Sequence, residues 1–370
     1  MISLSEITSK ILGEAKLNMS VPSDIRKLYS LFKKNGHQLY IVGGAVRDAI
    51  LGSSPKDFDL ATDAKPDKVL QMAKDAGIKS VEVGKAFGVV MIGGHEIATF
   101  RKDIGSGRRP DSVDFTDIQG DVKRRDLTIN ALFYDIGRGE IVDLVGGIAD
   151  LKKNCIRCVG DADRRFAEDP LRKLRAIRFA GSTGGKLEQK TFEALRKNPN
   201  ISGVSSERIR DEFIKGIQKA KSVTNYLKLA SDLGLLKQIL KGFNVDVGFK
   251  NITDYIVQIA YLLRKNNPDR VGSQLKSLKY QNQEAYDIWF LLKLIKFNSK
   301  DIYTYKNDQK KSKLSSSQLK QWGSLIGQGS MITKMDRFKL SVKGNDVAKL
   351  GFKGKDIGDK IKDLEYQKFK

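Results

Sequence analysis

Short apolar segments separated by glycines run through the first 160 residues of the chain. Brief apolar runs, or apolar and polar residues in alternation, are typical of strands. The pattern predicts strands at Gln38–Val42, Asp57–Leu60, Val81–Val83, Val89–Ile92, Glu96–Phe100, Thr128–Tyr134 and Ile141–Val142. The other elements expected here are one or two amphipathic helices within residues 1–36, a short helix at Ala45–Leu51, a charged loop at Arg101–Pro110 and a turn at Gly146-Gly147. This part of the chain is therefore expected to form a mixed α/β domain.

After Asp161 the pattern changes to apolar residues at three- and four-residue spacing, which is typical of amphipathic helices. This spacing occurs in Phe166–Ala180, Leu227–Leu240, Tyr255–Leu263 and Ala285–Ile295, whereas strand patterns largely vanish. Residues 306–320, which include three consecutive serines, are predicted to be a solvated linker. We expect an α+β protein with an α/β head (1–160) followed by an all-helical neck (161–220), body (221–320) and tail (321–370).

The chain is strongly basic. It contains 67 Lys and Arg against 44 Asp and Glu, which gives a net charge of +23. The last 80 residues, from Leu291 to Lys370, hold 19 of these cations and only 8 acidic residues. Such a surface favours polyanions. A solubility-tuned surface is the simpler alternative, and an anionic membrane surface is a third that no amphipathic anchor supports.

Other bulk features restrict the location of the protein. No run of 18 apolar residues is present, and the first residues lack the basic and then apolar pattern of a secretory signal. Cys155 and Cys158 are the only cysteines, which fits a reducing compartment. We expect a cytoplasmic protein with no membrane partner, and the sequence leaves the oligomeric state open.

The most informative stretch is a glycine turn followed by two carboxylates. Gly43-Gly44 precedes Arg47, and Asp57 and Asp59 come shortly afterwards. Residues two apart in a strand face the same way, so the two carboxylates are expected to project together. Mg²⁺ prefers such oxygen ligands, and glycines allow backbone N–H groups to approach a triphosphate. Each feature alone is usually a turn or a solvated strand edge, but their order is specific.

A second cluster contains Arg124, Arg125, Asp126 and Asn130. The two arginines suit phosphates, while the carboxylate and the amide suit ribose hydroxyls. A helix cap with charged neighbours is an equally good interpretation of this cluster alone.

A third cluster begins at Asp169-Pro170, which is typical of a helix N-cap with proline at the first helical position. Arg172, Arg175 and Arg178 then follow at three-residue spacing on one broad face. The cluster is either a solvated basic face or a site where Asp169 accepts from, and Arg172 donates to, the edge of a base.

Together these clusters resemble the motifs of the tRNA nucleotidyltransferase and bacterial poly(A) polymerase family, the class II CCA-adding enzymes. The family carries, in order, G-G-x-V-R-D, D-x-D, R-R-D-x-T-I-N-A, D-x-x-G-G-x-x-D-L and E-D-P-x-R. The matching segments are Gly43–Asp48, Asp57–Asp59, Arg124–Ala131, Asp143–Leu151 and Glu168–Arg178, with a further brace-like segment at Glu207–Phe213. Asp143-Leu144 departs from the common Asp-Pro of the fourth motif.

The resemblance implies roles for individual residues in the head. Asp57 and Asp59 would hold catalytic Mg²⁺, and Glu96 is a candidate third carboxylate. The residues that would contact the incoming nucleotide are Gly44, Arg47 and Arg125, with Asp126 on the ribose.

In the neck, the resemblance implies that Asp169 and Arg172 pair with the base, with Arg175 and Arg178 supporting base and phosphates. Cytosine and adenine both present an amino donor beside a ring acceptor, whereas uracil and guanine reverse that order. An acceptor beside a donor can therefore select CTP and ATP without a template.

The expected function is template-independent addition of CMP and AMP to the 3′ end of a tRNA, from CTP and ATP with Mg²⁺. The segment Gly344–Gly358 resembles the tail signature of tRNA-processing members, whereas Val83–Gly88 partly resembles a poly(A) polymerase segment. A poly(A) polymerase of the same fold therefore stays an alternative, as does a catalytically dead RNA-binding protein.

Three other patterns are discounted as functional sites. The pair Cys155 and Cys158 lacks the further ligands that zinc needs. His37 and His95 are the only histidines, which argues against histidine-based hydrolysis. Trp289 and Trp322 are expected to be core or interface residues rather than base-stacking platforms.

Overall fold

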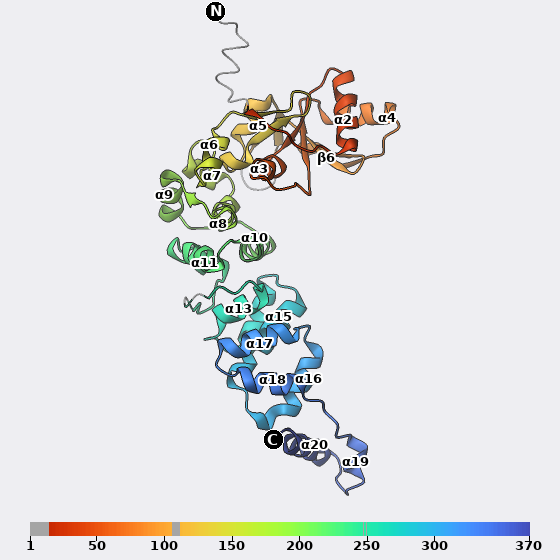
Figure 1. Ribbon diagram of the computed structural model, residues 1–370, viewed down its shortest axis with the longest axis vertical. Helices are drawn as coiled ribbons and strands as arrows, with labels where there is room; N and C mark the ends of the chain where they lie inside the picture. The colour runs from red at the N-terminus through yellow and green to blue at the C-terminus, as the bar shows by residue number, and fades with distance from the viewer. Residues whose placement is uncertain (1–14, 106–111, 247, 249) are drawn as a thin grey trace, which may run out of the picture. The chain divides into compact units, whose positions relative to one another are not determined.

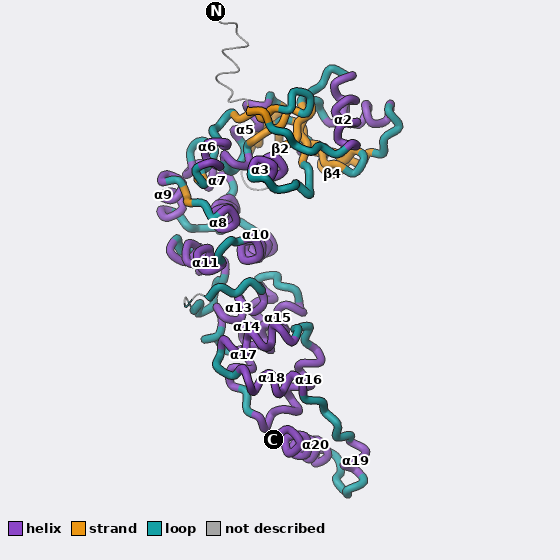
Figure 2. The backbone as a smooth tube through the Cα atoms, in the orientation of Figure 1, coloured by secondary structure: helices purple, strands orange, loops and turns teal. Residues whose placement is uncertain are grey.

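The computed structural model describes residues 15–105, 112–246, 248 and 250–370 (Figure 1). The chain divides into two compact units, Met1–Val204 and Ser205–Lys370. The strands of the described residues all lie in the first unit, and the second is built from helices (Figure 2). The expected α+β class is confirmed, while the finer division at residues 160, 220 and 320 stays a prediction.

One eight-stranded sheet organises the first unit. Its strands are antiparallel to their neighbours except for the parallel pair β3 and β6. Their spatial order is β1 (Ala15–Lys16), β10 (Glu140–Asp143), β9 (Leu132–Asp135), β2 (Leu39–Val42), β3 (Asp59–Thr62), β6 (His95–Thr99), β5 (Val89–Ile92) and β4 (Ser80–Gly84). The central position of β2 places the glycine turn at its end next to both β3 and β9.

Alternation along β2 divides its side chains between two faces. Tyr40 and Val42 belong to a buried cluster in which the rings of Tyr40, Phe100 and Phe133 lie 6.0–6.1 Å apart. The helices among the described residues of this unit are α2 (Ser23–Lys34), α3 (Gly44–Ile50), α4 (Pro66–Asp75), α5 (Ile118–Lys123), α6 (Gly147–Lys152), α7 (Ala162–Glu168), α8 (Leu171–Thr183) and α9 (Gln189–Lys197). A 3-10 turn, Lys85–Phe87, lies between β4 and β5.

Three expectations for the first unit need correction. Arg101–Ile104 is strand β7, paired with β8 (Ser112–Phe115), and is not a loop; the rest of the expected loop lies outside the described residues. The stretch from Thr128 begins as a 3-10 turn, Thr128–Asn130, before β9 starts. The third correction concerns β3, which begins at Asp59, so that Asp57 precedes the strand; its burial is continuous after Asp59 rather than alternating.

A short parallel ladder joins the sheet-containing region to the helices that follow it. Cys155–Ile156 (β11) pairs with Lys186–Leu187 (β12). Helices α7 and α8 lie within the chain segment between these two strands, so both ends of that segment are held together.

The second unit consists of helices in its described residues. They are α10 (Ser206–Lys219), α11 (Val223–Asp232), α12 (Leu235–Ile239), α13 (Tyr255–Leu263), α14 (Pro268–Ser277), α15 (Asn282–Lys293), α16 (Ile302–Lys311), α17 (Ser316–Leu325), α18 (Gly329–Arg337), α19 (Gly344–Ala348) and α20 (Lys355–Phe369), with 3-10 turns at Leu294–Lys296 and Ser299–Asp301. Among the described residues, none of the helices combines the length and the apolar character needed to cross a bilayer.

The prediction of a solvated linker at residues 306–320 is wrong. Most of it is helical, in α16 and α17, and only residues 312–315 connect the two helices. Ser315 caps α17, since its hydroxyl accepts from the Gln318 N–H at 3.3 Å while the Gln318 side chain accepts from the Ser315 N–H at 2.8 Å. Buried Ile302 and Tyr305 anchor α16 despite its many lysines.

Candidate active site

The glycine turn after β2 positions Arg47. Gly43 has φ +70° and ψ −119°, a conformation that is strained for residues with a side chain. Its N–H donates to the Leu132 carbonyl at 2.9 Å, which fixes the turn against β9. Helix α3 starts at Gly44, and one turn later the Arg47 guanidinium donates to Asp48 Oδ1 at 2.7 Å and Asn130 Oδ1 at 2.6 Å. The sequence-predicted order of turn and arginine thus becomes a fixed cation one turn after the N-terminus of α3.

The carboxylate pair lies at the start of β3. Asp57 and Asp59 are both exposed. Desolvation of its carboxyl by surrounding protein atoms raises the pKa of Asp59, Arg125 acts in the opposite direction, and the negative charge of Asp57 raises it further. The two carboxylates are therefore electrostatic neighbours although only Asp59 belongs to the strand.

Glu96 occupies the neighbouring strand. Leu60 of β3 is paired with Ile97 of β6 in parallel register, so Asp59 and Glu96 stand side by side one position earlier. Within the described residues, however, no group of three or more His, Cys, Asp or Glu side chains converges closely enough to hold a metal ion on its own.

Asp121 organises the two arginines of the second cluster. It is 1% exposed and accepts from Arg124 at 2.7 Å and from Arg125 at 2.9 Å. The Arg125 guanidinium also lies 4.6 Å from the centre of the Phe133 ring and donates to the Asn130 carbonyl at 3.3 Å. Sequence reasoning missed Asp121, although its spacing of three and four residues before the arginines was the available signal.

Asp126 connects the second cluster to the third. Its Oδ2 accepts from Arg175 Nε at 2.6 Å, and its Oδ1 accepts from the Leu127 N–H at 2.8 Å and from Asn130 Nδ2 at 3.4 Å. Burial works to raise the pKa of Asp126, but Arg175 and these hydrogen bonds outweigh it and hold the pKa below its usual value. The carboxylate expected on a ribose is thus also the anchor of a neck arginine.

Asp169 and Arg172 lie at the start of α8. The helix begins at Leu171, one residue later than expected, but Asp169 still acts as a cap, because its Oδ1 accepts from the Leu171 N–H at 3.1 Å. Arg172 donates to Glu168 Oε2 and to the Arg124 carbonyl, both at 2.8 Å. Its side chain is 15% exposed, so the expected base-reading donor is held in a defined orientation.

Phe179 of α8, which sequence reasoning missed, lies among three of the predicted arginines. Its ring centre is 4.9 Å from the guanidinium carbon of Arg47, 5.5 Å from that of Arg175 and 4.1 Å from that of Arg178. The ring is 6% exposed. An aromatic residue in an apolar helical stripe gives no sequence signal for such a role, because Arg47 is distant in sequence.

The fourth motif, Asp143–Leu151, caps one helix and contacts the turn that carries Asn130. Asp143 accepts from the N–H groups of Gly147 at 2.9 Å and Ile148 at 2.8 Å, which caps α6. Asp150 then accepts from the Thr128 hydroxyl at 2.7 Å and from Arg157 at 3.0 Å. The segment therefore fastens α6 against the turn that carries Asn130.

The cysteine pair has the properties of packing residues. Both cysteines are free thiols; Cys158 is buried, and burial raises the pKa of its thiol to about 12.

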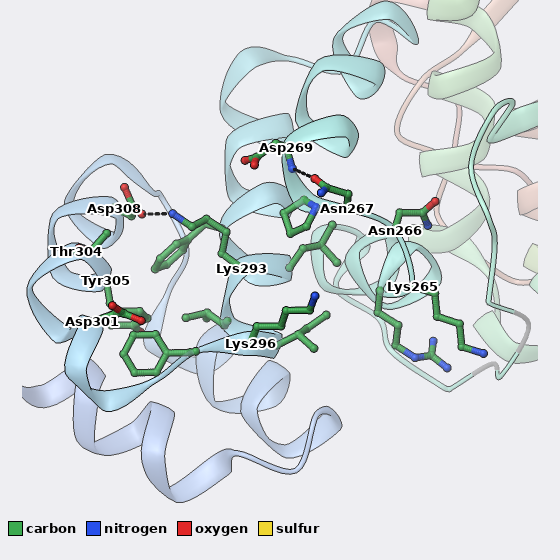
Figure 3. Close-up of a pocket in the computed structure, with 17 residues that line it drawn as sticks. Lys265, Asn266, Asn267, Asp269, Lys293, Lys296, Asp301, Thr304, Tyr305 and Asp308 are labelled. Atoms are coloured by element: carbon green, nitrogen blue, oxygen red, sulfur yellow. Dashed lines mark hydrogen bonds and ion pairs between the residues drawn. The ribbon is translucent and has the colours of Figure 1, made fainter.

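Concave surfaces also lie away from the carboxylate pair. In the first unit, a cleft of about 660 Å³ beside α5 and α7 is lined by both signs of charge, with Arg124, Arg165 and Arg172 in its wall. In the second unit, a cavity of about 780 Å³ lies among α14, α15 and α16 (Figure 3). There Lys293 is paired with Asp308 at 2.9 Å, and none of the sequence-predicted site residues lines the cavity.

A glycine turn, two carboxylates at the start of a central strand and an arginine network that continues into the following helix define a nucleotidyltransferase-type head. The comparisons with known proteins agree. Residues 39–157 match the family model described as "Poly A polymerase head domain", and residues 185–246 match "Probable RNA and SrmB- binding site of polymerase A".

The chain belongs to the family of CCA-adding enzymes. It is 36% identical over 297 residues to a CCA-adding enzyme of Lactococcus lactis subsp. cremoris, an alignment that covers 71% of this chain and 72% of that protein. Identity to a CCA-adding enzyme of Ligilactobacillus salivarius is 40% over 207 residues, covering 53% of this chain and 50% of the relative. The chain thus matches about half the length of some curated relatives.

Solved structures show the same fold. The Bacillus stearothermophilus CCA-adding enzyme in complex with CTP superposes with a TM-score of 0.67 at 23% identity, covering 93% of this chain and 92% of that one. A Thermotoga maritima CCA-adding enzyme complexed with tRNA_CCA gives 0.66 at 20% identity, with 98% and 94% covered. At this low identity the superpositions show a shared fold only, and this shared fold covers nearly the whole chain.

Proposed function

We propose that this protein is a template-independent tRNA nucleotidyltransferase, which transfers CMP and AMP from CTP and ATP to the 3′ end of a tRNA in the cytoplasm. The observation that carries the proposal is the pairing of Asp57 and Asp59 beside Arg125, next to an arginine network that reaches from Arg47 to α8. A carboxylate pair and a fixed cationic group are what phosphoryl transfer requires. Membership of the CCA-adding family supports the choice of tRNA.

The carboxylate pair fits Mg²⁺. This ion usually takes one or two protein carboxylates and completes its shell with water and substrate phosphates, so a site of two exposed Asp side chains is sufficient. Desolvation is the main cause of the raised pKa of Asp59 and the negative charge of Asp57 adds to it, and a bound cation would offset both. When bound, Mg²⁺ supplies activation of the attacking 3′-hydroxyl and neutralisation of the phosphate charge.

The remaining steps belong to the residues of the chain. Backbone N–H groups at Gly44 and the guanidinium groups of Arg47 and Arg125 bind and orient the triphosphate. Asp126, with one oxygen already bound to Arg175, orients the ribose. Asp169 accepts from the amino group of cytosine or adenine, and Arg172 donates to the neighbouring ring nitrogen, so that UTP and GTP are rejected.

A poly(A) polymerase of the same fold is the alternative within the family, because the matched head model carries that name. A catalytically dead RNA-binding protein is the alternative from another class, and the intact carboxylate pair argues against it.

One experiment separates the three functions. The protein is incubated with tRNA lacking its 3′ end, with each triphosphate alone and with all together, and the products are sequenced. Addition of C, C and A, or of part of that sequence, supports the proposal. A long A tail on an unrelated RNA identifies a poly(A) polymerase, and binding without extension identifies a dead enzyme.

A further inference from the structure

The ring of Phe179 is a point where two parts of the arginine network meet. Arg47 comes from α3, directly after the glycine turn, whereas Arg175, Arg178 and the ring itself come from α8. All three guanidinium carbons lie 4.1–5.5 Å from the ring centre, within the range of about 6 Å in which an aromatic face attracts a cation. The Arg47 contact is the long-range one, and it joins the head to the helix that carries the proposed base reader.

A second, polar chain connects the same two elements. Arg47 donates to Asn130 at 2.6 Å, Asn130 donates to Asp126 at 3.4 Å, and Arg175 donates to Asp126 at 2.6 Å. With Phe179 in contact with both Arg47 and Arg175, the contacts form a closed circuit. The separation of the two guanidinium groups is therefore set from two sides, by hydrogen bonds on one and by an aromatic ring on the other.

Three like charges around one ring repel each other. The negative charge of Asp48 offsets the positive charge of Arg47, and the negative charge of Asp126 offsets the positive charge of Arg175. The ring quadrupole attracts all three cations. The three guanidinium groups are held close together although they repel each other. An anion with several charged oxygens reduces this repulsion, because each guanidinium then gains a strong charge-assisted hydrogen bond. The arrangement is that of a preorganised receptor for a polyphosphate.

We propose that Phe179 is a positioning residue, which holds Arg47 in register with Arg175 and Arg178 so that the three cations meet the triphosphate of the incoming nucleotide as one group. The proposal rests on the proposed function and adds a residue that touches no substrate. Phe179 acts on nucleotide affinity through the arginines, and it leaves the reacting atoms to the carboxylate pair.

The test compares Phe179→Leu and Phe179→Met, which keep apolar volume but remove the ring, with Phe179→Tyr, which keeps the ring. For each variant, KM and kcat are measured with CTP and with ATP. Binding of inorganic tripolyphosphate is measured by calorimetry at a temperature below the melting temperature of that variant. Loss of the ring is expected to raise KM and the tripolyphosphate Kd by about 5- to 30-fold, with a much smaller change in kcat. Phe179→Tyr should restore both constants.

Phe32→Leu is the matched control. Phe32 is a fully buried ring of α2 in the same unit, and among the described residues no cationic group is recorded over it. It should lower the melting temperature but leave KM unchanged. The proposal is overturned if Phe179→Leu and Phe179→Met bind tripolyphosphate as the wild type does, or if Phe32→Leu raises KM equally. Failure of the proposed function looks different, since the wild type would then extend no RNA while the tripolyphosphate comparison still reports on the ring.

Discussion

The two compact units bury their carboxylates for different purposes. In the first unit, buried Asp121, Asp126 and Asp150 each hold arginine side chains. In the second, Glu365 accepts from the backbone N–H groups of Ser341 and Val342, and Asp287 accepts from the N–H of Lys313. Asp121, Asp126 and Asp150 therefore aim cationic groups in the first unit, although buried Asp143 of that unit caps α6 instead. In the second unit, Asp287 and Glu365 fasten connectors between helices.

With the proposed function, this difference predicts separate tasks for the two units. Fixed arginines around a carboxylate pair suit chemistry on a triphosphate, which needs precise placement. The second unit instead keeps its large excess of lysines for the surface, where charge acts at longer range and without fixed geometry. Chemistry should thus depend on single residues of the first unit, and RNA affinity on the summed charge of the second.

The largest effect is expected at the carboxylate pair. Asp57→Ala or Asp59→Ala should lower incorporation by at least about a thousandfold, because one of the two carboxylates proposed to hold the metal is lost where several kcal/mol of charge stabilisation are needed. Binding of tRNA should persist, as measured by filter retention of labelled tRNA. Glu96→Gln, in the neighbouring strand, should have a smaller effect. Substantial turnover by purified Asp57→Ala protein would contradict the metal assignment.

The next largest effect concerns base choice. Asp169→Ala and Arg172→Ala should each lower CTP and ATP use and narrow the preference over UTP and GTP by about 10- to 100-fold, since one mispaired polar group costs about 1–3 kcal/mol. Competition among all four triphosphates measures this preference. The double variant should be non-additive, because both residues act on one base edge.

Unchanged preference in both single variants would mean that the base is read elsewhere. Because Arg172 also donates to Glu168 and to the Arg124 carbonyl, melting temperatures of all variants need to be compared alongside.

Substitutions of Asp121 and Asp287 test the difference between the buried carboxylates of the two units directly. Burial tends to raise the pKa of Asp121, but Arg124 and Arg125 outweigh it and lower the pKa from its usual 3.8. Asp121→Asn should cost about 3–5 kcal/mol of stability at neutral pH, because two arginines lose a buried partner. A group with a lowered folded-state pKa stabilises above its unfolded pKa, so the cost should shrink as acid protonates Asp121 in the wild type.

Chemical unfolding at pH 7 and near pH 3 measures this cost. Asp287→Asn should also destabilise the protein, but only Asp121→Asn should raise KM for the nucleotide. An equal rise in KM for both variants would remove the distinction between the units.

The smallest effect per residue is expected on the basic surface of the second unit. Deleting residues 341–370 would strip buried Ile361 and Phe369 from the fold, so charge removal is the sharper change. Replacing exposed Lys349, Lys353 and Lys355 with Gln should weaken tRNA binding and reduce its salt dependence by roughly one unit of log–log slope per lost phosphate contact. Extension of a short oligonucleotide acceptor should be the same in this variant as in the wild type.

The matched control is the triple Gln variant of exposed Lys27, Lys68 and Lys74, on α2 and α4 of the first unit. It removes the same charge. If this control weakens tRNA binding as much as the first triple does, the basic excess of the tail has no special part in RNA affinity.

Most strands of the eight-stranded sheet, and some of the helices, followed from local patterns. Strand segments such as Val89–Ile92 and the helix Tyr255–Leu263 match the sequence expectation to the residue, since short buried strands and strongly apolar helices carry clear periodicity. The errors fall where local patterns mislead. The lysine-rich α16 has few apolar positions, and the serines that suggested a linker include the cap of α17.

The site was predicted only as far as single residues and short motifs could carry it. Asp57, Asp59 and the arginines were found by their order along the chain, and their roles stay predictions. The links between them were not foreseeable, because Arg47 meets Asn130 and Phe179 across long sequence separations. The spacing of Asp121 before Arg124 and Arg125 indicates pairing, but its burial is known only from the structure.

The parallel pairing of β11 with β12 limits how this protein can change in evolution. Ile156 and Leu187 are held opposite each other, and the chain between them carries α7 and α8. One residue inserted in α8 between Asp169 and Arg175 would rotate everything after it by about 100° and turn Arg175 away from Asp126. Because the pairing of β11 with β12 fixes both ends of the segment, the segment cannot compensate for that rotation. Insertions and deletions should therefore be excluded from this segment.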